Sequence, residues 1–391
     1  MKHPIELLER YWNFSEFRPQ QEAIIEAVLA NEDCIALLPT GGGKSICFQI
    51  PALIRDGICL VVSPLVALMH NQVDNLNSKG IKAMALTSGL NYVDLDRMLD
   101  NCVFGNYKFL YLSPERLQQD LVQQRIKQMD VNLIVVDEAH CISQWGHDFR
   151  PAYRDIKLLR KIHPSVNVIG LTASATSKVV KDISDQLDCL SPKIFKTSFK
   201  RSNLAFLTLE CNDKLRMTVQ ILKKYSGTSI IYVRNRKSTF EISSYLNKIG
   251  ISSVYYHGGL STVEKANQFN LWMSYSNRVM VATNAFGMGI DKSNVQTVIH
   301  HNLPESLESY YQEAGRAGRN GDNAYAVILT NNTDEVKTKK EQVGSIPSID
   351  FLKKVYKRER TVQWVPPTFP EGSFDRIEYS TWEDIMENKF K

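Results

Sequence analysis

The feature that most constrains the fold is an alternation of short apolar runs with segments of helical spacing. The apolar runs are rich in β-branched residues and have the length of buried strands. Five of them lie in the first half of the chain, at 33–38, 58–63, 109–113, 133–137 and 168–172. Segments such as 65–77 and 179–187 repeat apolar residues at helical intervals. Strands that alternate with helices predict βαβ units and a parallel sheet.

The same rhythm starts again after residues 199–203. Strands are predicted at 229–233, 253–256, 279–282, 298–301 and 324–329, and helices at 239–249 and 263–272. A chain of 391 residues is long enough for two domains. We therefore predict one α/β domain over residues 1–204 and a second over 205–335. The pattern fails over 336–391, where four prolines interrupt a polar stretch, so this segment is predicted to be a short C-terminal tail or appendage.

Composition excludes few classes of protein. Hydrophobic residues make up 43% and charged residues 23%, as in soluble globular proteins. The net charge of +5 is compatible with a polyanionic partner but is weak support for one. The N-terminus lacks the apolar run of a signal peptide and no run approaches 18 apolar residues, so we predict a cytoplasmic protein without a membrane span. The seven cysteines form no CxxC pair, which favours buried, reduced thiols over disulfides or zinc ligands.

A glycine-rich turn follows the first predicted strand. It reads Pro39-Thr40-Gly41-Gly42-Gly43-Lys44-Ser45 and leads into a helical pattern. The glycines allow several backbone N–H groups to converge on phosphate oxygens, Lys44 can reach the β and γ phosphates, and Ser45 can ligate Mg²⁺. Leu38 replaces the first glycine of the usual phosphate-loop pattern. The position between strand and helix favours a nucleotide site over a purely structural turn.

An acidic pair follows the strand predicted at 133–137. Four apolar residues precede Asp137 and Glu138, which places the pair at the same edge of the sheet as the phosphate loop. Asp137 suits a hold on Mg²⁺, and Glu138 suits polarisation of the attacking water in phosphoryl transfer. An acidic turn exposed to solvent is the alternative.

Two arginines in the second predicted domain repeat a Gly-Arg pair. Arg316 and Arg319 are three residues apart and flanked by small residues, so they are expected to share one helical face. Cations that reach the γ-phosphate when two domains close would act as arginine fingers. A solvated helix surface is the alternative.

Together these motifs resemble a superfamily 2 helicase, and more narrowly the RecQ family, in order from about Trp12 to Leu329. The resemblance implies two tandem RecA-like P-loop domains with parallel sheets. It also implies an ATP- and Mg²⁺-dependent DNA helicase that moves 3′ to 5′ on single strands and unwinds duplexes in DNA repair or recombination. The expected partners are single-stranded and partially duplex DNA, and the chain is expected to be a monomer.

The resemblance also assigns residues to the nucleotide and to DNA. Residues 14–21 resemble the family's adenine-recognition motif, in which Phe14 stacks on the base, Gln21 hydrogen-bonds its edge and Arg18 assists. Matches to further motifs add Gly289 and Asp291 to the nucleotide site. They also add Ser63, Ser113, His257 and Thr283 to the DNA contacts.

The most family-specific stretch covers residues 140–151 and resembles the aromatic-rich loop of RecQ proteins. Trp145 and Phe149 offer flat faces for unstacked bases, and Arg150 or His147 can bind phosphate. The alternative is that Trp145 is a core residue. No cysteine follows Cys211, so neither the zinc module nor the winged helix of many RecQ proteins is predicted, and no zinc is expected. An RNA helicase, a duplex translocase, a non-catalytic nucleic-acid scaffold and a small-molecule P-loop kinase are the other functions considered.

Overall fold

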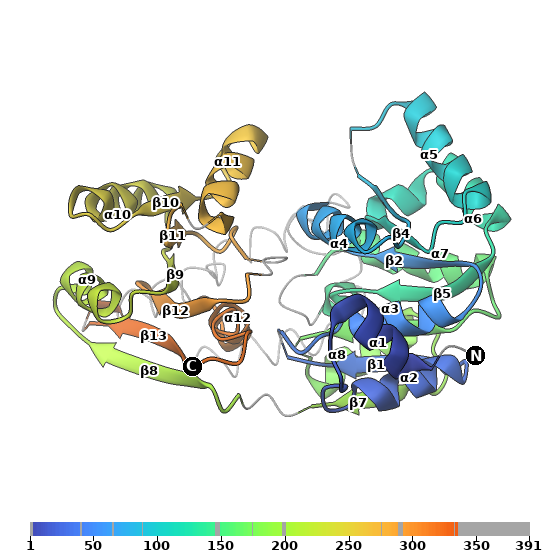
Figure 1. Cartoon of the computed structure of the whole chain (residues 1–391), viewed down its shortest axis with the longest axis horizontal. Helices are drawn as coiled ribbons and strands as arrows, with labels where there is room; N and C mark the ends of the chain where they lie inside the picture. The colour runs from blue at the N-terminus through green and yellow to red at the C-terminus, as the bar shows by residue number, and fades with distance from the viewer. Residues whose placement is uncertain are drawn as a thin grey trace, which may run out of the picture. The chain divides into compact units, whose positions relative to one another are not determined.

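Two parallel β-sheets, each covered by helices on both faces, make up the described part of the chain (Figure 1). The computed structural model describes residues 3–39, 41–64, 66–87, 89–144, 149–173, 175–197, 201–274, 276–287, 292–331 and 333–334. The predicted tail over 336–391 lies outside these ranges. The prediction of two parallel α/β folds in tandem is confirmed.

The first sheet has seven strands in the order β3-β4-β2-β5-β6-β1-β7, and every pair is parallel. Its strands are β1 (Cys34–Leu37), β2 (Ile58–Val62), β3 (Ala83–Leu86), β4 (Phe109–Leu112), β5 (Val131–Val136), β6 (Val168–Thr172) and β7 (Lys193–Lys196). All five predicted strands of this half are present. The sequence pattern missed β3, whose letters AMAL include no β-branched residue, and β7, an edge strand with two lysines.

Helices enclose this sheet because each has one apolar face. One side is covered by α2 (Gln21–Leu29), α3 (Ile46–Ile54) and α4 (Val66–Ser78). The other is covered by α5 (Tyr92–Phe104), α6 (Asp120–Gln128), α7 (Lys157–Ile162) and α8 (Ser177–Gln186). Helix α1 (Pro4–Trp12) packs on α2 and α3 through Leu7 and Leu8. Three 3₁₀ turns complete this part: η1 (Pro114–Gln118), η2 (Ala139–Ile142) and η3 (Pro151–Ile156).

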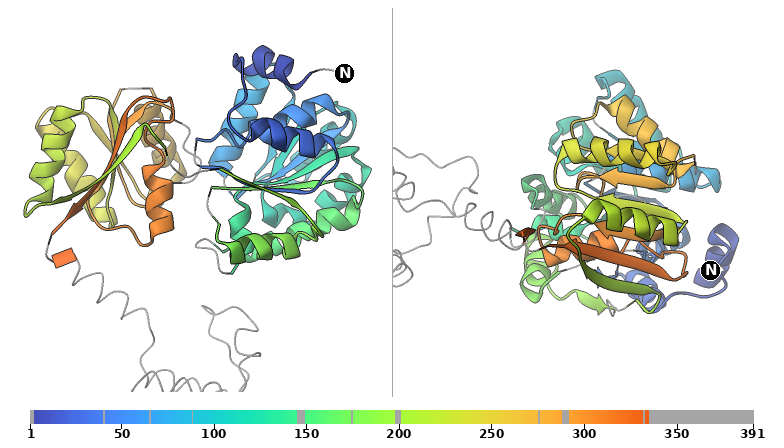
Figure 2. Two further views of the ribbon diagram at one scale, coloured as in Figure 1. Left: turned by 90° about the horizontal axis from the view of Figure 1, so that it is seen from below. Right: turned by 90° about the vertical axis from the view of Figure 1, so that its left-hand side faces the viewer.

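The second sheet has six parallel strands in the order β10-β11-β9-β12-β13-β8. They are β8 (Leu204–Glu210), β9 (Thr228–Tyr232), β10 (Ser253–Tyr256), β11 (Val279–Ala282), β12 (Val295–His300) and β13 (Ala324–Thr330). Helices α9 (Lys214–Lys224) and α10 (Arg236–Lys248) cover one face, and α11 (Thr262–Met273) and α12 (Leu307–Ala314) cover the other. Figure 2 shows the helices on either side of each sheet from two further directions. Only β8, a mostly exposed edge strand, was not predicted.

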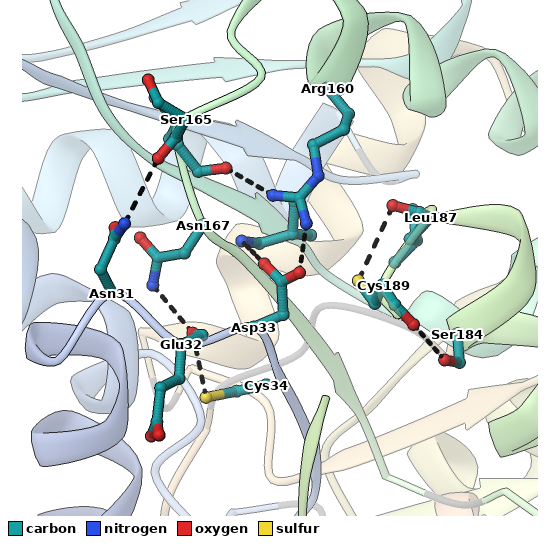
Figure 3. Close-up of polar contacts among 12 residues, drawn as sticks. Asn31, Glu32, Asp33, Cys34, Arg160, Ser165, Asn167, Ser184, Leu187 and Cys189 are labelled. Carbon is teal, nitrogen blue, oxygen red and sulfur yellow. Dashed lines mark hydrogen bonds and ion pairs between the residues drawn. The ribbon is translucent and has the colours of Figure 1, made fainter. Parts of the chain in front are cut away.

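A polar cluster lies at the N-terminal ends of β1 and β6 in the first sheet (Figure 3). Asp33 accepts a hydrogen bond from the backbone N–H of Val168 at 2.8 Å and forms an ion pair with Arg160. Asn167 donates to the Glu32 carbonyl at 3.0 Å. These contacts join the starts of β1 and β6 to α7. Because β1 runs from this cluster to the glycine-rich turn, the cluster lies at the opposite end of the strand from the candidate site.

The seven cysteines, all within the described ranges, form no disulfide, and six of them are buried. Burial raises the pKa of the Cys47 thiol to about 12, which disfavours its reactive thiolate form. Among the described helices, none has the length and apolar character to cross a membrane.

Candidate nucleotide and nucleic-acid site

The glycine-rich turn lies between β1 and α3, as predicted for a phosphate loop. Gly41 and Gly43 have positive φ angles of 79° and 77°, a conformation that glycine adopts without steric cost. The turn is closed by a hydrogen bond of 2.8 Å from the N–H of Gly42 to the carbonyl of Pro39. Helix α3 begins directly after Ser45, so the positive end of its dipole lies at the turn.

Two side chains from the segment before α2 hold this loop from outside. Arg18 donates to the carbonyl of Gly41, and Gln21 donates to the carbonyl of Gly43 at 3.0 Å. The Gln21 side-chain oxygen accepts the N–H of Arg18 at 2.8 Å. A Cβ on Gly43 would collide with the Gln21 amide, so the glycine is needed for this approach. Arg18 and Gln21 therefore contact the phosphate loop itself, and their expected contact with adenine stays a prediction.

The acidic pair follows β5, and the backbone around it is fixed. The N–H of Asp137 donates to the Val62 carbonyl at 2.9 Å, and the Tyr153 hydroxyl donates to the Asp137 carbonyl at 2.9 Å. Glu138 has a φ of 47°, a left-handed conformation that is uncommon outside glycine and asparagine. Strain of this kind persists only where surrounding contacts hold the residue in place.

The Glu138 carboxylate lies between two nitrogen groups. Its Oε1 is 3.6 Å from Nζ of Lys44, and its Oε2 is 3.4 Å from Nδ1 of His140. His140 is buried, and the same Nδ1 lies 3.0 Å from the Thr172 hydroxyl at the end of β6. Lys44, from the turn after β1, and His140 thus meet at the Glu138 carboxylate, and His140 links it to the last residue of β6. His140 was not among the predicted site residues, although its place two residues after the acidic pair was a usable signal.

Burial and neighbouring charges change the pKa of Asp137. Burial, and secondly the neighbouring Glu138 carboxylate, raise the pKa of Asp137 to about 6, while Lys44 acts in the opposite direction. A cation beside Asp137 would stabilise its ionised form. Carboxylate and hydroxyl oxygens are ligands that Mg²⁺ prefers, so Asp137 and Ser45 fit such an ion.

A cavity of about 890 Å³ adjoins these groups. It falls in the size range of small-molecule sites. Its walls include most of the predicted nucleotide-binding residues that the structure describes, namely Phe14, Arg18, Gln21, Gly41, Gly43, Lys44, Ser45, Asp137, Glu138, Arg316 and Arg319. Phe14 is 52% exposed, which leaves its ring available to a ligand. Thr40, Gly289 and Asp291 lie outside the described residues.

Arg316 and Arg319 do not share a helical face, so that prediction is wrong. Helix α12 ends at Ala314, and residues 315–320 form consecutive turns. Gly318 has a φ of 65°, and a side chain there would collide with Asn203 and Ala324. The left-handed glycine breaks the helical path between the two arginines.

The arginine turn, residues 315–320, is held by two residues that were not among the predicted site residues. Arg201 donates to the carbonyls of both Gly315, at 3.0 Å, and Gly318. Asn203 donates to the Gly318 carbonyl at 2.7 Å and to the Asp322 carbonyl at 2.8 Å. A planar guanidinium can bridge two acceptors in this way. Both residues lie just before β8, where the sequence pattern restarts, but the pattern carried no sign of their target.

The predicted DNA contacts form two groups at the C-terminal ends of strands. Ser63 follows β2 and Ser113 follows β4, and the N–H of Ser63 donates to the last residue of β4 at 3.1 Å. Arg150 donates to the Pro64 carbonyl at 3.1 Å, which places it beside Ser63.

In the second sheet, His257 follows β10 and Thr283 follows its neighbour β11. Of the aromatic-rich loop, Phe149 lies 5.2 Å from the guanidinium of Arg154, whereas Trp145 and His147 lie outside the described residues.

Comparison with known families agrees with this geometry. Residues 18–183 match the family described as DEAD/DEAH box helicase, and residues 213–321 match the helicase conserved C-terminal domain. The chain is 41% identical to the ATP-dependent DNA helicase RecQ of Bacillus subtilis, over 83% of this chain and 55% of that protein. It is 39% identical to the protein of the same name from Pasteurella multocida, over 83% of this chain and 52% of that one.

Solved structures share the fold at lower identity. The helicase Lhr of Mycobacterium smegmatis, bound to single-stranded DNA and AMP-PNP, matches with a TM-score of 0.69 and 20% identity, over 89% of this chain and 51% of that one. Dbp5 of Saccharomyces cerevisiae, bound to RNA and ADP BeF3, matches with a TM-score of 0.69 and 18% identity, over 92% and 97%. The chain spans about half the length of the two RecQ proteins it matches. It belongs to the RecQ family and contains the superfamily 2 helicase core of that family.

Proposed function

We propose that the chain hydrolyses ATP to move 3′ to 5′ along single-stranded DNA and to unwind duplexes, in DNA repair or recombination. The observation that carries the proposal is the Glu138 carboxylate, held 3.6 Å from Lys44 and 3.4 Å from His140 beside the phosphate loop. A base, a cation and a phosphate-binding turn at one sheet edge are what phosphoryl transfer to water requires. The names of the relatives, ATP-dependent DNA helicases, support DNA as the nucleic acid along which the chain moves.

Each residue has a chemical task in this proposal. Lys44 and the N–H groups of the loop neutralise the β and γ phosphates, and Ser45 and Asp137 hold Mg²⁺. The ion, when bound, neutralises charge that develops on the phosphate oxygens. Glu138 accepts a hydrogen bond from the attacking water and orients it. His140 is a positioning residue, because it contacts the Glu138 carboxylate and the end of β6.

DNA is proposed to lie over the two groups at the strand ends. Ser63, Ser113 and Arg150 would contact it on the first sheet, and His257 and Thr283 on the second. Trp145, His147 and Phe149 remain proposed base and phosphate contacts. A surface of hydroxyl groups and cations suits the sugar-phosphate backbone of DNA. Contacts to that backbone supply most of the affinity for DNA without sequence preference.

The test is the rate of ATP hydrolysis with no nucleic acid, single-stranded DNA, duplex DNA and RNA of matched length. Single-stranded DNA is expected to stimulate most, and Lys44→Ala to abolish turnover, because the γ-phosphate loses its nearest fixed cation. Stronger stimulation by RNA would favour the RNA-helicase alternative. Turnover by Lys44→Ala at the parent rate would contradict the ATP site.

A further inference from the structure

Three aromatic rings line the edge of the second sheet beside α10, and nothing assigned so far explains two of them. The ring of Phe240 meets that of Tyr255 edge to face, with centroids 5.4 Å apart and planes at 87°. The ring of Tyr255 in turn lies 6.0 Å from that of His257. We call Phe240, Tyr255 and His257 the aromatic strip. Tyr255 lies in β10, and His257 is the first residue after that strand.

The aromatic strip is open to solvent at its Phe240 end. Phe240 is 55% exposed, while the residues of α10 that pack on the sheet, Ile242 and Leu246, are buried. Among the described strands, β10 is the last in its sheet, so its outer side is an edge. In the described part of the chain, the buried Nδ1 of His257 has no hydrogen-bond partner. Phe240 thus offers an exposed aromatic ring beside the edge strand.

Cations flank the strip where β10 ends. Arg236 lies one helical turn before Phe240, and its guanidinium approaches Gly259, where a Cβ would be only 2.8 Å from Nη1. Lys265 donates to the Gly258 carbonyl at 2.9 Å. Two carboxylates lie nearby: Glu264 accepts the N–H of Ser261 at 2.8 Å and keeps its negative charge, and Glu241 pairs with Lys237 at 3.4 Å. Arg236 and Lys265 therefore place two positive charges beside the rings, against the single negative charge of Glu264.

We propose that the aromatic strip is a stacking surface for the unpaired bases of single-stranded DNA, with Arg236 and Lys265 holding the phosphates beside them. This inference rests on the proposed function and extends the proposed DNA-binding surface beyond His257. Single-stranded DNA fits better than duplex, because the bases of a duplex already stack on one another. An edge-to-face pair leaves ring faces available to a third ring.

The test measures binding of the full chain to two fluorescent oligonucleotides of equal length, one of thymidylate and one with abasic sites throughout. Phe240→Ala is expected to weaken binding of the thymidylate strand by about fivefold or more, the lower end of what one stacked base contributes. The abasic strand carries the same phosphates but no rings, so parent and variant should bind it equally. Phe240→Trp should restore the affinity for the thymidylate strand.

The matched control is Tyr245→Ala, which removes another exposed aromatic side chain from the same helix, 42% exposed and outside the strip. It should bind both strands as the parent does. Equal binding of the thymidylate strand by the parent and Phe240→Ala, or an equal loss on both strands, would overturn the stacking role. A parent chain that binds neither strand would instead contradict the proposed DNA function itself.

Discussion

At the scale of single residues, Glu138 is the side chain on which hydrolysis should depend most. Glu138→Gln keeps the shape of the side chain and its left-handed backbone but removes the negative charge between Lys44 and His140. We expect ATP to bind as tightly as to the parent while turnover falls by about a hundredfold or more, the scale of a lost general base. Nucleotide binding by fluorescence and steady-state hydrolysis measure the two effects separately. The control is Glu26→Gln, an exposed carboxylate on α2. Near-parent turnover by Glu138→Gln would mean that another group orients the water.

At the scale of elements, the arginine turn should depend on Arg201. Arg201→Lys keeps the positive charge but replaces the planar guanidinium with an ammonium group. A single nitrogen must then donate to the carbonyls of both Gly315 and Gly318. We expect kcat for ATP to fall about ten- to a hundredfold with little change in KM, as for catalytic groups displaced by about an ångström. Arg216→Lys on the exposed side of α9 is the matched control. A rise in KM with unchanged kcat would contradict a positioning role in the transition state.

At the scale of the whole molecule, hydrolysis should require both sheets. Lys44 and Glu138 come from the turns after β1 and β5, whereas Arg319 comes from the turn after α12. Arg319→Ala is expected to spare ATP binding and to lower turnover by on the order of a thousandfold, as removal of an arginine finger does. The same binding and turnover assays measure the two effects for Arg319→Ala, and Arg316→Ala is measured in parallel. A loss confined to ATP affinity would show that Arg319 contacts bound ATP but does not stabilise the transition state of hydrolysis.

The repeating pattern of apolar strands and helices was enough to predict two parallel sheets, because burial on both faces leaves a local signature in each strand. Every central strand was predicted within a few residues. The strands that were missed, β3, β7 and β8, lie at sheet edges. β7 and β8 are largely exposed, so their composition is under weaker constraint, whereas β3 is buried but contains no β-branched residue.

The sequence by itself determined which candidate groups the chain carries: a glycine turn with Lys44 and Ser45, an acidic pair after a strand, and paired arginines. Their residue types and spacings are local, so they can be read without a fold. Only the tertiary structure decided that His140 contacts Glu138, that Arg201 spans the arginine turn, and that Phe240 meets Tyr255. The arginine turn shows why: its spacing favoured one shared helical face, but α12 ends at Ala314 and a left-handed Gly318 close to Asn203 lies between the two arginines. Such contacts depend on packing, and packing has no period that a sequence pattern reveals.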